Sequence, residues 1–117
     1  MPAVASSSAT EFPGLVHADF VIGDRDGTTA HTALSKLVCQ HLEACGYSVS
    51  YNHPYKGVEL VRRYSDPTQN RHSIQIEINR RLYMNEQTRE LLPNHVPLKQ
   101  NLRSLVELLS KTDPRAL

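Results

Sequence analysis

The stretch that decides how this sequence folds is SIQIEIN, residues 73–79. Isoleucine alternates strictly with polar residues, and successive side chains of a β-strand point to opposite faces of its sheet. The stretch therefore predicts a strand with its three isoleucines on one face and its polar residues on the other. We expect the isoleucines beneath packed helices, where burial contributes about 1.5–3 kcal/mol for each side chain.

Other elements can be predicted outward from this strand. They are strands at residues 18–22, 47–51 and 59–64 and helices at residues 29–44, 85–92 and 97–110. Thr28 or Thr29 is expected to cap the first helix, and Pro97 to begin the last one, because its fixed φ suits a first helical turn. Strands that alternate with helices predict an α/β fold, here a partial mixed sheet with flanking helices.

The chain of 117 residues has the length of one domain. We expect residues 1–16 to be a loop or tail, residues 17–112 to form the folded unit, and residues 113–117 to be a second tail. The apolar fraction is 39%, against about 45–50% for a typical globular protein. The core is therefore expected to be thin for this length.

Charge and cysteine content limit the partners and the compartment. The net charge is +1, from 13 basic and 12 acidic residues, so we expect neither a nucleic-acid partner nor a membrane surface. No apolar run approaches the roughly 20 residues of a membrane helix. Cys39 and Cys45 fall in one helix-like segment and face different sides of it, and residues 1–5 lack the basic start of a signal peptide. Reduced thiols in the cytoplasm are expected.

Glu77 is the first candidate for chemistry, on the strand face shared with Gln75 and Asn79. A carboxylate in this position can be a solvated or paired residue. It can also be a general base whose pKa the surrounding sheet raises toward neutrality. The residue pattern leaves both interpretations open.

Two loops hold further candidates. GDRDG, residues 23–27, lies between a strand and a helix, where α/β sheets bind ligands. Arg25 can grip a carboxylate with its planar fork or pair structurally with Asp24 or Asp26. NHPYKG, residues 52–57, gathers a histidine, a phenol and an ammonium, either for function or as an ordinary surface loop. The six histidines and two cysteines show no zinc-ligand spacing.

Three blocks together resemble the N-formylglutamate amidohydrolase family. They are VIGDRDGTT at residues 21–29, NHPYKG at residues 52–57, and QIEINR at residues 75–80 followed by LYM at residues 82–84. They occur in the order found in the family, and the resemblance covers roughly residues 1–110. It implies the carboxyl-terminal half of a zinc-carboxypeptidase-like (phosphorylase/hydrolase-like) fold.

The resemblance implies zinc-dependent hydrolysis of an N-formyl or N-acyl amino acid, as in amino-acid (histidine) catabolism. The metal would polarise the formyl carbonyl and lower the pKa of its bound water. Glu77 would be the catalytic base, and Arg25 and Arg80 would bind the substrate carboxylate. Asn79, Tyr55 and Lys56 are weaker candidates for substrate contact.

This sequence also departs from the family pattern. Val58 and Asn85 stand where members usually have Gly and Asp. Members are roughly twice as long, and their zinc ligands lie in the amino-terminal half. One ligand lies in an Asp-Cys-His-Ser-Met-Pro stretch, and Met1-Pro2 resembles the end of that stretch. We therefore expect a truncated hydrolase that binds no metal by itself and is completed by a separate amino-terminal half. A non-catalytic remnant and a carboxylate-binding module are the alternatives.

Overall fold

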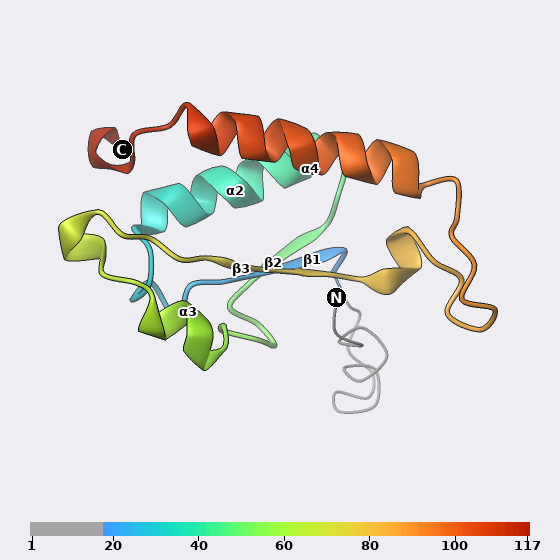
Figure 1. Ribbon diagram of the computed structural model, residues 1–117, viewed down its shortest axis with the longest axis horizontal. Coiled ribbons are helices and arrows are strands. Elements are labelled where there is room, and N and C mark those ends of the chain that lie inside the picture. Colours follow the sequence, from blue (N-terminus) through green and yellow to red (C-terminus); the bar gives the residue numbers. More distant parts are fainter. Residues whose placement is uncertain (1–17) are drawn as a thin grey trace.

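A mixed sheet of three strands organises the structure, a computed structural model that describes residues 18–117. The strand order is β2-β1-β3, with β1 parallel to β2 and antiparallel to β3. Helices α2 and α4 cover one face of this sheet, and the short helix α3 lies on the other side (Figure 1). The elements are β1 (Phe20–Gly23), α2 (Thr32–Ala44), β2 (Val49–Tyr51), α3 (Glu59–Arg63), β3 (Gln75–Ile78) and α4 (His95–Ser110), with 3-10 turns η1 (Pro67–Gln69), η2 (Arg80–Leu82) and η3 (Pro114–Ala116). The mixed α/β architecture expected from the sequence is therefore present.

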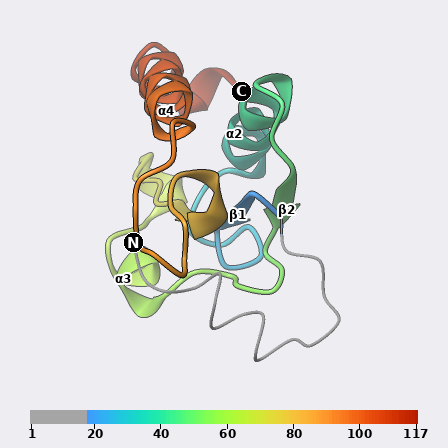
Figure 2. The same ribbon diagram turned by 90° about the vertical axis from the view of Figure 1, so that its right-hand side faces the viewer.

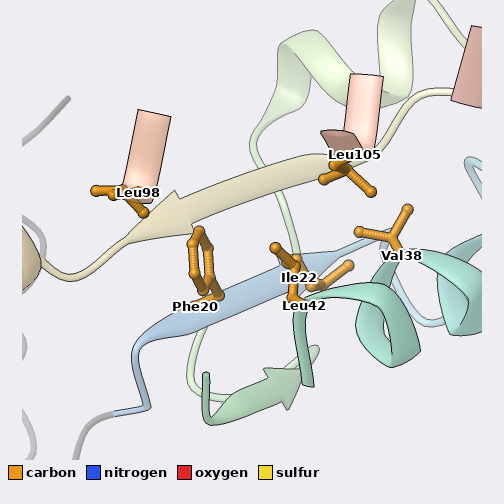
Figure 3. Packing of buried hydrophobic residues seen from close by; sticks show 6 residues of the cluster. All are labelled: Phe20, Ile22, Val38, Leu42, Leu98 and Leu105. Carbon is orange, nitrogen blue, oxygen red and sulfur yellow. The ribbon is translucent and has the colours of Figure 1, made fainter. Parts of the chain in front are cut away.

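The core lies between the sheet and the two long helices. Phe20 and Ile22 of the central strand β1 are fully buried and face this core. Figure 3 shows their side chains on β1 together with those from α2 and α4; the core cluster consists of Phe20, Ile22, Val38, Leu42, Leu98 and Leu105. The strand at residues 73–79 is confirmed as β3, and its three isoleucines pack against this cluster but are only partly buried.

Two predicted helices begin elsewhere than expected. Helix α2 begins at Thr32, and His31 caps it by accepting a hydrogen bond from the Ala33 N–H at 3.1 Å. The Thr29 hydroxyl instead donates to the Ser73 carbonyl at 2.9 Å, so it is not the cap. Helix α4 begins at His95, so Pro97 lies in its first turn. The N–H groups of the first turn have no acceptor within the helix, so a proline there costs no helical hydrogen bond.

Two other predicted elements are wrong. Residues 59–64 were expected to form an edge strand, but helix α3 lies there. In this helix the Arg62 guanidinium donates a hydrogen bond to the Glu59 carboxylate, three residues earlier, at 2.9 Å. Residues 85–92, expected as a helix, form a turn closed by a bridge between Met84 and Leu91. The Asn85 side chain accepts hydrogen bonds from the N–H groups of residues 87 and 88 and so replaces the helical pattern there.

The predicted tails have different outcomes. Residues 1–16 lie outside the described residues. Residues 113–117 contain the turn η3, which the Asp113 side chain caps by accepting from the Arg115 N–H at 3.0 Å. Cys39 and Cys45 are both free thiols. Within residues 18–117, no helix is long and apolar enough to cross a membrane.

Candidate active site

Glu77 lies on the face of the sheet that points away from α2 and α4. Glu77 lies opposite Val21 where β1 and β3 pair, and it is 9% exposed. Its Oε1 accepts a hydrogen bond from the Gln75 amide, whereas Oε2 is buried and has no partner among the described residues. Burial raises the pKa of Glu77, and the Gln75 hydrogen bond opposes that rise only in part. Glu77 is therefore not a solvated carboxylate but a buried one, and one of its oxygens has no partner among the described residues.

Gln75 connects Glu77 to the loop at residues 52–57. While its side-chain amide donates to Glu77, its carbonyl Oε1 accepts from the Val58 N–H at 2.9 Å. Gly23, opposite Gln75 in the sheet, permits this approach, since a Cβ there would lie 2.8 Å from the Lys56 carbonyl carbon and oxygen. The loop at residues 52–57 and the polar face of β3 therefore form one continuous site.

Arg25 belongs to the same site and is held by this loop. Its N–H donates to the Lys56 carbonyl at 2.6 Å, and its guanidinium donates to the Gly57 carbonyl at 3.0 Å. Arg25 occupies the left-handed region with φ 51°, and it forms no ion pair with either neighbouring aspartate among the described residues. The structural-pair alternative is thus wrong for Arg25, and one bond to Gly57 leaves other donors of its fork available.

Lys56 makes the ion pair that sequence reasoning considered for Arg25. Its ammonium lies 2.8 Å from the Asp26 carboxylate, and both side chains are more than half exposed. This ion pair ties the loop at residues 52–57 to the loop at residues 23–27. Tyr55 is half-buried in the former loop. Substrate contact by Lys56 and Tyr55 stays a prediction.

Asp24 is a buried residue of this site that sequence reasoning did not select. Its carboxylate is fully buried and accepts four hydrogen bonds. The donors are the Gly27 N–H at 2.7 Å, the Ser35 hydroxyl at 2.7 Å, the Asn52 amide at 2.8 Å and the Tyr51 hydroxyl. Asp24 therefore joins both site loops to the start of α2. Its place directly after a buried strand was the available signal, because a buried carboxylate requires donors.

The hydrogen-bond network around Asp24 changes the pKa values of Asp24 and Tyr51. Burial alone would raise the pKa of Asp24, but the hydrogen bonds from Tyr51, Asn52, Ser35 and Gly27 lower it below its ordinary value. Tyr51 responds in the opposite sense, since burial, its hydrogen bond to Asp24 and the charge of Asp24 raise its pKa to about 12. Asp24 is thus held as an anion and Tyr51 as a neutral donor.

Asn79 and Arg80 lie at the other end of β3. The Asn79 side chain accepts from the Arg81 N–H at 3.2 Å and caps η2, which begins at Arg80. A strand rises about 3.3 Å per residue, so Gln75 and Asn79 are separated by about 13 Å along β3. Glu77 therefore lies between two ends of the site, with Arg25 near one end and Arg80 near the other.

A metal site cannot be built from the described residues alone. No group of three or more His, Cys, Asp and Glu side chains in residues 18–117 is placed to hold a metal ion. The hydrogen-bond partner found for the Glu77 carboxylate among the described residues is the Gln75 amide, which is not a usual zinc ligand. A groove of about 420 Å³ lies on the helix side of the sheet, lined in part by Ile74 and Ile76, and none of the predicted site residues lines it.

The comparisons with known proteins agree on one family. Residues 1–84 match the model of the family described as N-formylglutamate amidohydrolase, a segment that includes all six predicted site residues. The N-formylglutamate deformylase of Pseudomonas putida is 36% identical over 97 residues, which are 75% of this chain and 36% of that protein. That of Pseudomonas aeruginosa is 36% identical over 72 residues, 59% of this chain and 26% of that protein.

A solved structure supports the same assignment. The crystal structure of N-formylglutamate amidohydrolase from Ralstonia eutropha JMP134 matches with a TM-score of 0.85 and 40% identity. The match covers 100% of this chain and 42% of that chain. This protein thus spans only about a third of the P. putida relative and less than half of the solved structure. The match of the family model over residues 1–84 and the shared fold at 40% identity together show that the chain belongs to the N-formylglutamate amidohydrolase family.

Proposed function

We propose that this chain supplies the proton-accepting carboxylate and the substrate-binding arginine of a deformylase site that acts on an N-formyl amino acid. The reaction adds water across the amide bond between the formyl carbon and the amino nitrogen. A C–O bond forms, the C–N bond breaks, and the products are formate and the free amino acid. The single observation that carries the proposal is the buried, unpartnered Oε2 of Glu77 in a chain of this family.

The surroundings of Glu77 suit the role of general base. Burial raises its pKa, which brings a carboxylate closer to the pKa range in which it both accepts and returns a proton near neutral pH. Oε1 is held by Gln75, so the carboxylate orientation is set, and the unpartnered Oε2 is the atom to which the attacking water would have to bind. Glu77 would take the proton of that water during attack and deliver it to the departing amine.

Arg25 is the better-supported ligand for the substrate carboxylate. Its backbone and guanidinium are fixed by the carbonyl groups of Lys56 and Gly57, so little side-chain entropy is lost when a carboxylate binds. Arg80 is the second candidate, at the opposite end of β3. A small substrate that extends from Glu77 toward one end would engage one arginine and not the other.

Zinc dependence, which the family resemblance implies, would require metal ligands from outside residues 18–117. Within residues 18–117, no group of three or more His, Cys, Asp and Glu side chains is placed to hold a metal ion. We propose that the remaining groups of the site lie in the part of the fold that this sequence does not span, which is more than half of the solved relative. We also propose a zinc-carboxypeptidase-like fold and a cytoplasmic location. The two free thiols support the cytoplasmic location.

The test of the proposed function combines this chain with the missing part of the fold. The full chain is co-expressed with the part of the R. eutropha protein that it does not cover, and formate release from N-formylglutamate is measured. Glu77→Gln should lower turnover by about 10²–10⁴-fold, the usual contribution of a general base. The exposed Glu107 provides a matched control, because Glu107→Gln makes the same chemical change away from the site. Unchanged turnover in Glu77→Gln would refute the role of Glu77.

Stability provides a second readout that needs no activity. A carboxyl group whose pKa is raised by folding favours the folded state when protonated, and that favourable contribution is lost as the pH rises through the folded pKa. Glu77→Gln removes this ionisation, so the variant should gain stability over the native chain at pH 7 and lose that gain near pH 4. Urea denaturation at both pH values measures the difference. An equal effect at both pH values would show that Glu77 is not a buried, unpaired carboxylate.

A further inference from the structure

Two amide side chains flank Glu77 on the polar face of β3. Gln75 and Asn79 each stand two residues away from it, and side chains two residues apart on a strand share one face. The Asn79 oxygen serves the backbone, since it accepts from the Arg81 N–H at 3.2 Å and caps η2. Gln75 is the partner found for the Glu77 carboxylate among the described residues. The two amides therefore have different roles, and Gln75 is the one directed at the candidate general base.

The orientation of the Gln75 amide is determined by its two partners. An amide has an acceptor oxygen and an NH₂ donor, whereas the Val58 N–H can only donate. The Gln75 oxygen must therefore face Val58, from which it accepts at 2.9 Å, and the NH₂ group must face Glu77. A hydrogen bond donated to a carboxylate favours the ionised form. Burial raises the pKa of Glu77, and the hydrogen bond from Gln75 limits that rise.

Only a side chain that carries both a donor and an acceptor makes these two bonds. A carboxylate in place of the Gln75 amide could accept from the Val58 N–H, but it would repel the charge of Glu77. A hydrocarbon side chain could bond neither group, and it would leave the Val58 N–H without this acceptor. The contacts at both ends of Gln75 therefore depend on the amide itself.

The Val58 end of this contact leads to the arginine proposed to bind the substrate. Val58 directly follows the loop at residues 52–57, two carbonyl groups of which hold Arg25 at 2.6 Å and 3.0 Å. Figure 2 shows α2 and α4 on one side of the strands, and α3 with the chain that leads into it on the other side. Glu77 faces that second side. Gln75 therefore connects the candidate base to the loop that holds Arg25.

We infer that Gln75 is a positioning residue whose amide holds the Glu77 carboxylate in one orientation and fastens it to the loop that holds Arg25. The inference rests on the proposed function, because it assigns Gln75 a part in the proton transfer at Glu77. Gln75 acts through Glu77 and through Val58, not on the substrate itself. Without its donor the carboxylate can rotate, and without its acceptor the loop loses its tie to β3.

Nuclear magnetic resonance of the ¹³C,¹⁵N-labelled full chain tests the contact without any activity. The Val58 amide should shift with the same pH midpoint as the Glu77 carboxyl carbon, because groups in a chain of hydrogen bonds polarise one another. Glu59 titrates separately, since its hydrogen bond with Arg62 holds its pKa below the ordinary value. A Val58 amide that does not change across the titration of Glu77 would overturn the inference.

Two variants separate the two bonds of Gln75. Gln75→Leu removes both, so the Glu77 midpoint should rise by at least about one pH unit, a tenfold change in proton affinity, and the Val58 amide should no longer follow it. Gln75→Glu keeps the acceptor for Val58, and its carboxylate should titrate with Glu77 as a coupled pair in two steps. This second variant also covers the case in which Gln75→Leu does not fold.

The control is Gln100→Leu, which removes an amide from the exposed surface of α4. It should leave the midpoint of Glu77 and the shift of the Val58 amide as they are in the native chain. A Glu77 midpoint that is the same in both Gln75 variants as in the control would overturn the positioning role.

In the co-expressed protein of the activity assay, kinetics separate positioning from a general loss of structure. Gln75→Glu keeps the loop fastened, so kcat should fall at least about tenfold while KM changes less than about threefold. The acidic limb of kcat/KM should move to higher pH together with the Glu77 midpoint. An increase in KM at unchanged kcat would contradict a role through Glu77.

The outcomes for the two proposals can be told apart. If the Val58 amide follows Glu77 but formate release does not depend on Glu77, the deformylase function is refuted and the contact made by Gln75 stays supported. If formate release depends on Glu77 but neither Gln75 variant changes kcat or the Glu77 midpoint, the positioning role is refuted and the function stays supported.

Discussion

Replacing Asp24 with asparagine tests whether its hydrogen-bond network holds the candidate site together. Asp24→Asn keeps one acceptor oxygen for the Gly27 N–H and the Asn52 amide, but it places an NH₂ group where the Ser35 and Tyr51 hydroxyls now donate. Each hydrogen bond to a charged acceptor contributes about 1.5–3 kcal/mol. Two such bonds amount to about 3–6 kcal/mol. Because Tyr51 is 38% exposed and can turn to water, we expect a loss of about 2–4 kcal/mol.

The loss should depend on pH in a definite direction. Folding lowers the pKa of Asp24, because the four hydrogen bonds outweigh burial, so the contribution of the carboxylate is present above its unfolded pKa of about 3.9. It is lost as the pH falls through the lower folded pKa. The difference between the native chain and Asp24→Asn should therefore be largest at pH 7 and shrink below pH 4.

Urea denaturation followed by circular dichroism measures both quantities. Asp26→Asn is the control, because it changes the neighbouring aspartate, which is exposed and makes an ion pair with Lys56; it should cost about 0–1 kcal/mol. A loss below about 1 kcal/mol in Asp24→Asn, or the same loss at pH 3 and pH 7, would refute the reasoning about the network.

Two further predictions concern packing and reactivity. Gly23→Ala places a Cβ 2.8 Å from the Lys56 carbonyl carbon and oxygen, so it should cost about 1–3 kcal/mol and displace the loop at residues 52–57; an unchanged melting temperature together with unchanged amide shifts of Lys56 and Gly57 would contradict it. Burial raises the pKa of Cys39 to about 11, with the charges of Glu43 and Asp24 acting in the same sense, so iodoacetamide should label Cys45→Ser, in which Cys39 remains, slowly at pH 8 and faster as the pH approaches 11. Rapid labelling of Cys39 at pH 8 in the folded chain would show that the thiol is not shielded.

Local pattern predicted the elements whose side chains repeat with a clear period. The alternation at residues 73–79 and the apolar spacing of α2 and α4 required no knowledge of distant residues, because each period places one face against a core. The pattern failed at residues 59–64 and 85–92. At residues 59–64 the ion pair of Glu59 and Arg62 favours a helix. At residues 85–92 the Asn85 side chain bonds the backbone and favours a turn. Both effects outweigh weak intrinsic preferences for secondary structure.

The sequence by itself determined the strand that carries Glu77, the α/β class and, through three blocks of residues, the resemblance to the family that the comparisons then showed. Only the tertiary structure decided that Glu77 is buried with an unpartnered oxygen, that Arg25 is fixed by the loop at residues 52–57, and that Asp24 joins that loop to α2. The physical reason is that desolvation and hydrogen-bond partnership depend on groups distant along the chain. Gly57 is 32 residues from Arg25, and Asn52 is 28 residues from Asp24. Folding alone brings such groups within bonding distance.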